Sequence, residues 1–225
     1  MNPGLYVVGT PIGNLEDITL RALDVLRGVA VVLTEDTRHT GILLQRYEIR
    51  TPTVSCHKFN EASRTQWVIG RIQGGAAVAL VTDSGMPAVS DPGARMVAAC
   101  RAAGLPVSVL PGPSAVTAAV ALSGFGGRGF VFEGFLDHKE GARRRRLTEL
   151  VGVEAPIVLF ESPYRLERLL ADIEAVLGTR PVCVAREMTK RFEETVVGTA
   201  AEVRAAFAGR RVKGEIVVVV APLQH

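Results

Sequence analysis

Two segments of the sequence place charged side chains among small residues, a pattern that could bind a ligand or transfer a proton. Asp36 and Arg38 lie in TEDTRHT (34–40), directly after an apolar run, and LVTDSGMPAVSDPGARM (80–96) breaks its apolar approach at Asp83. A carboxylate beside a guanidinium can hold a proton or orient a polar substrate, and Arg38 could equally grip a phosphate. The small residues that follow Asp83 let a ligand touch the main chain. We expect ligand contact there, although a turn capped by Asp83 would use the same residues.

These segments follow short β-branched runs that alternate with helical patterns through the first half of the chain. The runs are LYVV (5–8), VAVVL (29–33), AVALV (77–81) and VSVL (107–110). Runs of this kind are typical of buried parallel strands, and Asn14 and Gly28 can begin and end a helix between the first two. The pattern predicts an open, mostly parallel α/β sheet, in which ligands bind at the carboxyl ends of the strands.

Four loops fall at these strand ends and should line one crevice. They are GTPIGN (9–14), TEDTRHT (34–40), TDSGMP (82–87) and PGPSA (111–115). The first loop does not match G-x-G-x-x-G, and no lysine follows it as in a P-loop, so it does not predict a phosphate cradle. By itself that loop fits a tight turn before a helix equally well.

A glycine-rich stretch, LSGFGGRG (122–129), separates this half from a second series of strand patterns. They are FVFEGF, PIVLFES, PVCVARE, TVVG and EIVVVVA. These strands follow one another more closely and leave room for fewer long helices, which predicts a mixed sheet in a second α/β domain. We place the two domains at residues 1–113 and 114–225.

The composition is that of a globular protein with one large core or two modest ones. The 225 residues are 48% hydrophobic and carry a formal net charge of +3, which permits a nucleic-acid partner without requiring one. No stretch approaches the roughly eighteen apolar residues of a membrane span, and the first residues lack a signal-peptide layout, so we expect a cytoplasmic protein. Cys56, Cys100 and Cys183 fit no metal or redox spacing and predict buried, reduced thiols.

Two basic clusters could bind nucleic acid. The first, HKEGARRRR (138–146), contributes Lys139, Arg143, Arg144, Arg145 and Arg146. The second, CHKFNEASR (56–64), adds Lys58 and Arg64, with Phe59 available to stack on a base. The alternatives are a solvated helix for the first cluster and a polar loop, with Asn60 as a helix cap, for the second. KRFEE and GRRVKGE, nearer the C-terminus, could extend the basic surface.

Seven segments, taken in order, carry a resemblance to a known family. They are LYVVGTPIGNLEDIT, EDTRHTGILL, VTDSGMPAVSDPGARMV, LPGPSAVTAA, FEGFL, FESPYRL and AREMTKRFEE. From Leu5 to about Val220 the chain closely resembles the ribosomal RNA small subunit methyltransferase I family, a branch of the tetrapyrrole (corrin/porphyrin) methylases. The resemblance implies two α/β domains with S-adenosylmethionine (SAM) in the cleft between them, and a homodimer. It also implies methylation of the ribose 2′-oxygen of a decoding-centre cytidine in 16S rRNA, either naked or in the small ribosomal subunit.

The resemblance also assigns roles to individual residues. The expected SAM contacts are Thr10, Pro11, Asp83, Ser84, Gly85, Met86, Pro87, Ser114, Ala115, Leu159 and Ala185. Of these, Ala185 and Leu159, or Phe160 beside it, would close over the adenine.

Methyl transfer to a hydroxyl needs in-line positioning and a group that accepts its proton or stabilises the oxyanion. The candidates for that role are Asp36, Arg38, Glu133, Glu161 and Lys190, and the sequence does not choose among them. Lys190 could instead form a solvated helical ion pair with Glu187, three residues before it.

Three other functions remain open. A tetrapyrrole-precursor methyltransferase would share the fold and the cofactor, but it would need a trough for an acidic macrocycle, whereas EDTRHT places carboxylates at the expected cleft. A protein methylator similar to diphthine synthase would not explain PIGNLEDIT and FESPYR. A ribosome-binding module without catalysis would bind small subunits and transfer no methyl group.

Overall fold

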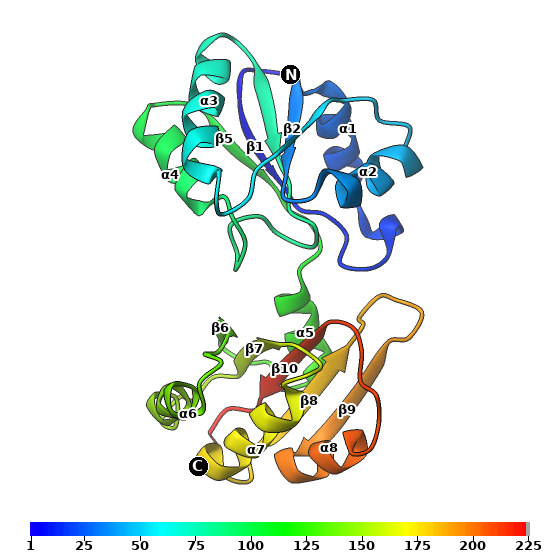
Figure 1. Cartoon of the computed structure of the whole chain (residues 1–225), viewed down its shortest axis with the longest axis vertical. Coiled ribbons are helices and arrows are strands. Elements are labelled where there is room, and N and C mark those ends of the chain that lie inside the picture. Colours follow the sequence, from blue (N-terminus) through cyan, green and yellow to red (C-terminus); the bar gives the residue numbers. More distant parts are fainter. Residues whose placement is uncertain (224–225) are drawn as a thin grey trace. The chain divides into compact units, whose positions relative to one another are not determined.

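The computed structural model describes residues 1–223, which form two compact units (Figure 1). The first unit comprises Met1–Ser114, and the second begins at Ala115. Each unit is built on a five-stranded sheet. The sheet is parallel in the first unit and mixed in the second. The predicted fold class, α/β with a parallel sheet followed by a mixed sheet, is therefore confirmed.

The strand order of the first sheet reverses between two neighbouring strands. Its strands are β1 (Gly4–Val8), β2 (Val31–Thr34), β3 (Thr53–Ser55), β4 (Ala77–Leu80) and β5 (Val107–Leu110). They are ordered β3-β2-β4-β1-β5, and all pairs are parallel. The chain leaves β1 toward β2 on one side and leaves β4 toward β5 on the other. The loops after β1 and β4 therefore start at a topological switch point, where open α/β sheets bind ligands.

Helices cover both faces of this sheet. They are α1 (Leu20–Gly28), α2 (Thr37–Arg46), α3 (Glu61–Gln73) and α4 (Ala94–Ala102). Leu26 and Leu43 of α1 and α2 pack on one face, and Ile72 and Met96 of α3 and α4 pack on the other (Figure 1). Because helices cover both faces over the inner strands, a strand such as β4 is buried at every residue, which explains its continuous apolar run.

The first helix begins later than its sequence pattern predicted. Asn14 caps only a short 3-10 turn, η1 (Leu15–Asp17). The cap of α1 is Thr19, whose extended backbone ends the turn and whose hydroxyl accepts a hydrogen bond from the backbone N–H of Ala22 at 3.1 Å. Gly28 is the last helical residue, as predicted. The segment between β1 and α1 is therefore a longer loop than expected.

The second unit has a mixed sheet with the order β6-β7-β10-β8-β9. Its strands are β6 (Val131–Phe135), β7 (Ile157–Glu161), β8 (Pro181–Arg186), β9 (Glu194–Thr199) and β10 (Ile216–Val220). β6 and β7 pair in parallel, whereas β10 enters antiparallel between β7 and β8, and β9 pairs antiparallel with β8. The last strand of the chain thus lies at the centre of this sheet.

The expectation of fewer long helices in the second half is wrong. The helices there are α5 (Ala115–Ser123), α6 (Glu140–Glu149), α7 (Leu166–Leu177) and α8 (Ala200–Phe207). Leu147, Leu170 and Val203, one from each of α6, α7 and α8, share a single core with the strands. The sequence pattern indicated α6 only as one alternative, a solvated helix, because its arginine-rich sequence buries only Arg143 and Leu147 and so has little apolar periodicity.

The three cysteine side chains are buried, free thiols. Burial raises the pKa of the Cys56 thiol to about 11 and also raises the pKa of Cys100 and Cys183. They stay protonated near neutral pH and pack as small apolar groups.

Within residues 1–223, no helix is long and apolar enough to cross a bilayer. In the same residues, no cluster of His, Cys, Asp and Glu side chains is arranged to hold a metal ion.

Three loops of the first unit meet at a pair of glycines. A Cβ atom added to Gly9, after β1, would lie 2.9 Å from the Cα atom of Gly112, after β5, and 2.6 Å from Sδ of Met86, after β4. No side chain larger than hydrogen fits at this crossing without displacing a loop. A Cβ atom added to Gly41 in α2 would have no heavy atom within 4 Å.

We predict opposite effects of adding one methyl group at these two kinds of glycine. Gly9→Ala should lower the free energy of unfolding by about 1–3 kcal/mol, because the loops must separate. Gly41→Ala should raise it by about 0.5–1 kcal/mol, because a helix interior favours alanine. Urea unfolding followed by the fluorescence of Trp67, the single tryptophan, reports on the first unit. A Gly9→Ala variant as stable as the parent would contradict the close contact.

Candidate functional site

Hydrogen bonds tie the loop after β1 to the loop after β4. The backbone N–H of Thr10 donates to the carbonyl of Gly85 at 2.9 Å, and the N–H of Gly85 donates to the carbonyl of Thr10 at 3.1 Å. The buried hydroxyl of Thr10 also donates to the carbonyl of Thr82 at 3.1 Å. Thr10 and Gly85, both expected to contact SAM, are thus held side by side at the switch point.

The loop after β2 joins them through Asp83. One carboxylate oxygen of Asp83 accepts a hydrogen bond from the backbone N–H of Asp36 at 3.1 Å. Together with the crossing of Gly9 and Gly112, this bond brings all four predicted loops to the same edge of the first sheet.

The other first-unit residues expected to contact SAM belong to the same loops. Those that are buried or half-buried are Pro11, Ser84, Met86, Pro87 and Ser114. Gly85 adopts a φ of +82°, a conformation that would strain any residue with a side chain. Ala115 differs from this group, because it is the first residue of α5 and belongs to the second unit.

Carboxylates without a cationic partner gather at this edge. Within the described part of the chain, no lysine or arginine forms an ion pair with Glu35, Asp83 or Asp91. Burial raises the pKa of Asp91, a hydrogen bond with Thr82 partly opposes the rise, and the charges of Glu35 and Asp83 add to it. The edge therefore favours a positively charged ligand. Sequence reasoning passed over Asp91, although it opens the DPG segment immediately after the predicted ligand loop.

Asp36 and Arg38 form a local pair on the first turn of α2. The Asp36 carboxylate accepts from the backbone N–H of Arg38 at 2.8 Å and meets its guanidinium at 2.8 Å. The hydrogen bond with the Arg38 side chain is the main reason that the pKa of Asp36 falls to about 2. Asp36 is thus a helix cap and a weak base.

Both carboxylate candidates of the second unit are held by arginines. Glu161, at the end of β7, is buried and accepts two hydrogen bonds from Arg165, at 2.7 and 2.9 Å. Glu133 in β6 accepts two from Arg146, both at 2.7 Å. Bidentate pairs of this kind fix the geometry of both partners. These residues are therefore placed to orient loops.

Lys190 is also fully paired. Its ammonium lies 2.9 Å from Glu187 and 2.7 Å from Glu215. Burial alone would lower the pKa of Lys190, but the bonds to these two carboxylates outweigh it and raise the pKa. The Glu187–Lys190 pair occurs in a turn with positive φ at Glu187, and the helical alternative is wrong. Lys190 stays protonated and can serve only as a cation or hydrogen-bond donor.

The two second-unit residues expected near the adenine lie inside strands. Leu159 of β7 packs in the helix-covered core and is fully buried, so its side chain cannot close over a ligand. Ala185 of β8 is also buried. Phe160 points to the opposite face of the sheet from Leu159, and its ring lies 5.0 Å from that of Phe132 and 5.6 Å from that of Phe135, both edge-on. Of Leu159 and Phe160, only Phe160 has a side chain that is partly accessible.

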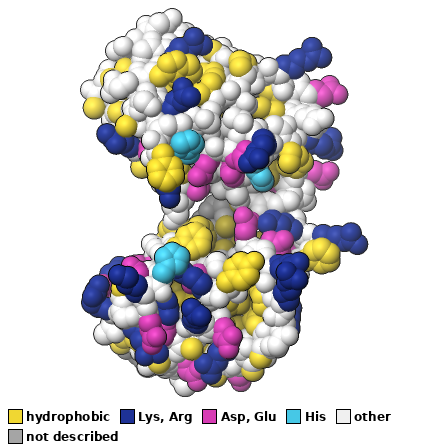
Figure 2. All heavy atoms as spheres, viewed as in Figure 1, with side chains coloured by type: hydrophobic (Ala, Val, Ile, Leu, Met, Phe, Trp, Pro, Cys, Tyr) yellow, Lys and Arg dark blue, Asp and Glu magenta, His cyan; other side chains and the backbone are white. Residues whose placement is uncertain are grey.

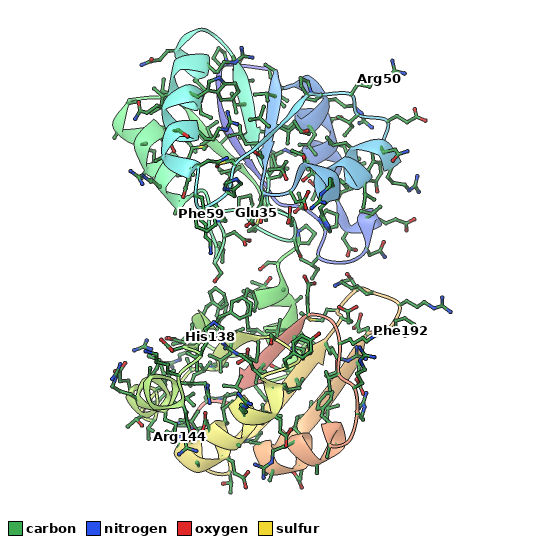
Figure 3. All side chains as sticks on the ribbon, in the orientation of Figure 1. Glu35, Arg50, Phe59, His138, Arg144 and Phe192 are labelled. Carbon is green, nitrogen blue, oxygen red and sulfur yellow. The ribbon has the colours of Figure 1, made fainter. Side chains whose placement is uncertain are left out.

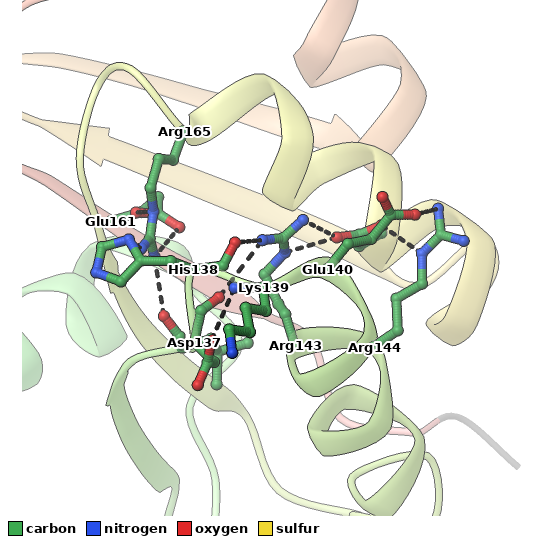
Figure 4. A network of polar contacts seen from close by, with 10 residues as sticks. Asp137, His138, Lys139, Glu140, Arg143, Arg144, Glu161 and Arg165 are labelled. Carbon is green, nitrogen blue, oxygen red and sulfur yellow. Dashed lines mark hydrogen bonds and ion pairs between the residues drawn. The ribbon is translucent and has the colours of Figure 1, made fainter.

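Three of the four arginines in the run of α6 form ion pairs within the protein, and Figure 4 shows those of Arg143 and Arg144. Arg143 is 5% exposed, and its Nε lies 2.6 Å from Asp172 of α7. Arg144 reaches the other oxygen of Asp172 at 2.6 Å. The expectation that Arg143 binds a phosphate is therefore corrected, because this side chain is buried and neutralised by Asp172. Lys139 and Arg145 are exposed and form no ion pair among the described residues.

In the second basic cluster, Lys58 and Phe59 are exposed on the loop before α3, where Figure 3 labels Phe59, whereas Arg64 is half-buried in α3. Phe59 is 86% exposed, and the ammonium of Lys58 lies 4.9 Å from its ring centre. Arg64 donates from Nε to the carbonyl of Ser55 at 3.0 Å, which orders the loop. Asn60 stands at the N-cap position of α3, as the alternative expected, but its side chain makes no capping hydrogen bond and instead accepts from the backbone N–H of His57 at 2.8 Å. Figure 2 shows basic side chains over both units.

We predict that the buried pair below the arginine run supports the fold. Asp172→Ala leaves Arg143 buried without a counter-charge and should lower the free energy of unfolding by about 3–5 kcal/mol. The control is Glu174→Ala, also in α7, which removes an exposed pair with Arg204 and should cost less than about 1 kcal/mol. Urea unfolding followed by circular dichroism measures both variants. Equal stability of the two would contradict a structural role for Asp172.

Comparison with known proteins identifies the relatives of this chain. Residues 4–204 match the family described as Tetrapyrrole (Corrin/Porphyrin) Methylases. The chain is 47% identical over 215 residues to the Ribosomal RNA small subunit methyltransferase I of Thermotoga maritima, with 96% of each protein covered. It is 45% identical to the protein of the same name from Synechocystis, with 96% of this chain and 78% of that protein covered.

Solved structures share the fold at lower identity. The uroporphyrin-III-C-methyltransferase of Thermus thermophilus aligns with a TM-score of 0.69 and 23% identity, covering 97% of this chain and 94% of that one. A diphthine synthase aligns with a TM-score of 0.75 and 17% identity, covering 98% and 91%. At these identities the structures establish the fold alone. The predicted resemblance is confirmed by the closer relatives, and the chain belongs to the ribosomal RNA small subunit methyltransferase I family of the tetrapyrrole methylases.

Proposed function

We propose that this protein is a SAM-dependent methyltransferase that methylates the ribose 2′-oxygen of a decoding-centre cytidine in 16S rRNA. The observation that carries the proposal is identity of 43–48% to proteins named Ribosomal RNA small subunit methyltransferase I, over 96% or more of this chain. A uroporphyrin-III C-methyltransferase of the same fold has been solved in complex with S-adenosylhomocysteine. The proposal includes a homodimer in the cytoplasm, as the family resemblance implies.

The loop edge of the first unit fits SAM. This cofactor carries a sulfonium cation, a ribose diol and an adenine, and it supplies an electrophilic methyl group when bound. Unpaired carboxylates such as Asp83 suit the cation, and the closely packed main chain around Thr10 and Gly85 suits contact with a flat or extended ligand. The four loops contain no lysine that could bind a phosphate. This agrees with SAM as the ligand, because SAM has no phosphate group.

The chain's own residues would work mainly by positioning. Asp36, Glu133 and Glu161 are committed to arginines, and Lys190 is protonated between two carboxylates. Holding a hydroxyl in line with its reaction partner can lower the barrier by about 7–11 kcal/mol in the best intramolecular cases. Lys190, protonated between Glu187 and Glu215, would act as a hydrogen-bond donor to the ribose oxygen and not as a base.

The RNA would meet exposed cations rather than the whole arginine run. Lys58, Lys139 and Arg145 are exposed and make no ion pair within residues 1–223. Such cations release counterions when they bind phosphates, and this makes affinity dependent on salt. Arg143 is left out of the proposed RNA surface because it is buried.

We predict one methyl group per target RNA. The protein is incubated with radiolabelled SAM and small ribosomal subunits that lack their native modifications, beside naked 16S rRNA and a uroporphyrinogen-type macrocycle. Nuclease digestion should place the label in a 2′-O-methylcytidine. Label found only in the macrocycle would replace the proposal by tetrapyrrole methylation. Binding of SAM and subunits without transfer would replace it by a non-catalytic ribosome-binding module.

We also predict that the charge of Asp83 distinguishes SAM from its product. Asp83→Asn should raise the Kd for SAM about five- to tenfold, equivalent to about 1 kcal/mol of lost attraction to the sulfonium. It should change the Kd for S-adenosylhomocysteine much less, because that molecule lacks the cation. Calorimetry measures both, with Asp24→Asn on the exposed face of α1 as the control. Equal losses for the two ligands would mean that Asp83 acts only through its bond to Asp36.

A further inference from the structure

The loop that joins β8 to β9 displays an isolated aromatic ring. Phe192 is 66% exposed, and the guanidinium of the neighbouring Arg191 lies 5.5 Å from its ring centre. Figure 3 shows the Phe192 side chain extending from the end of the hairpin. A large apolar ring in water does not stabilise the fold, so its exposure indicates a site where a ligand or partner binds.

The loop behind this ring is firmly built. Lys190 bridges Glu187 and Glu215, so the loop is fastened to the segment before β10. Arg186 donates to the carbonyl of Phe192 at 3.1 Å, and the N–H of Glu187 donates to the carbonyl of Glu215 at 2.9 Å. A ring presented on an ordered backbone loses less conformational entropy on binding than a ring on a loose loop.

The segments around the ring carry more cations than carboxylates, and one of the carboxylates, Glu193, is exposed beside Phe192 with no ion pair among the described residues. Arg186 and Arg210 share a single carboxylate, that of Glu194. In contrast, Arg191, Arg211 and Lys213 are exposed and form no ion pair among the residues that the structure describes. Arg186 also donates to the carbonyl of Lys213 at 3.0 Å, which places the GRRVKGE segment beside the hairpin.

This combination fits unpaired RNA. An apolar protein partner would have to bury the free cations around the ring, which is costly. Unpaired bases in RNA loops stack on aromatic rings and on guanidinium planes, while adjacent phosphates meet arginine and lysine. We propose that Phe192 and Arg191 form a stacking platform for an unpaired base of the RNA substrate, with Arg211 and Lys213 as contacts to its backbone. The inference rests on the proposed function, because it specifies how the same RNA is held.

Methyl transfer to unmodified small subunits tests the platform. Phe192→Ala should raise the KM for subunits about 5- to 100-fold, the range that loss of one stacked base gives, with an unchanged Kd for SAM. Phe192→Trp should keep the parent KM, and Phe192→Leu should lose most of the affinity, because a base stacks on a π face. Leu20→Ala, which trims an even more exposed apolar side chain on α1, is the control. A Phe192→Ala variant with the parent KM would overturn the proposal.

Salt dependence separates the ring from the cations assigned to the RNA backbone. Lys213→Gln should reduce the slope of log affinity against log salt by about one unit or less, because one phosphate contact is lost. Phe192→Ala should weaken binding by the same factor at every salt concentration. A Phe192→Ala loss that disappears at high salt would overturn stacking as its cause.

Fluorescence provides a readout that does not depend on activity. In a Trp67→Phe background, Phe192→Trp places the single tryptophan at the hairpin, and a base stacked on it should quench its emission when unmodified small subunits are added. Subunit binding without quenching would contradict the platform.

If the parent protein transferred no methyl group to RNA, the proposed function would fail, whereas normal transfer by Phe192→Ala would refute only this inference.

Discussion

The two hydrogen bonds that Thr10 and Gly85 exchange close the first unit at the point where its strand order reverses. Neighbouring strands at such a point send their loops in opposite directions, and the gap between the loops is what a ligand can fill. Here the gap is held to a fixed geometry, because Gly9 and Gly112 bring the loops after β1 and β5 into backbone contact. Any residue with a side chain at either glycine would separate them. The carboxylates at this edge owe their position to the same constraint.

Ion pairs determine which charged side chains remain for function. In the second unit, Glu133, Glu161 and Asp172 each hold an arginine, and Lys190 lies between two glutamates. Partly buried pairs with bidentate geometry orient the segments that carry them, so they fix the loops after β6 and β7 (Figure 4). A reaction that depends mostly on positioning needs a rigid frame more than it needs a free base. The paired side chains thus hold the loops rigidly. This agrees with methylation of a hydroxyl in which none of the paired candidates acts as a strong base.

The cations left over after this pairing describe a surface suited to RNA. In each unit an exposed phenylalanine has a basic neighbour over its ring, Lys58 beside Phe59 and Arg191 beside Phe192. A run of basic residues in the sequence does not show which of its side chains are exposed. Arg143 and Arg145 stand two positions apart in one run, yet one is buried against Asp172 and the other faces water. A helix turns its successive residues to different faces, and only the packing of α6 on α7 decides which face is covered.

The sequence by itself determined the family, the α/β class and the loops that meet at the edge of the first sheet. It could do so because buried parallel strands leave continuous apolar runs, and because ligand loops must follow such runs at one edge. It did not place Leu159, whose side chain faces the core while Phe160 faces the opposite side, because a strand buried on both faces lacks the alternation that reveals orientation. Nor did it separate catalytic candidates from structural ones. The partners of Glu161 and Asp172 lie on neighbouring helices or turns, and the charge that remains on each group depends on distances that only the tertiary structure sets.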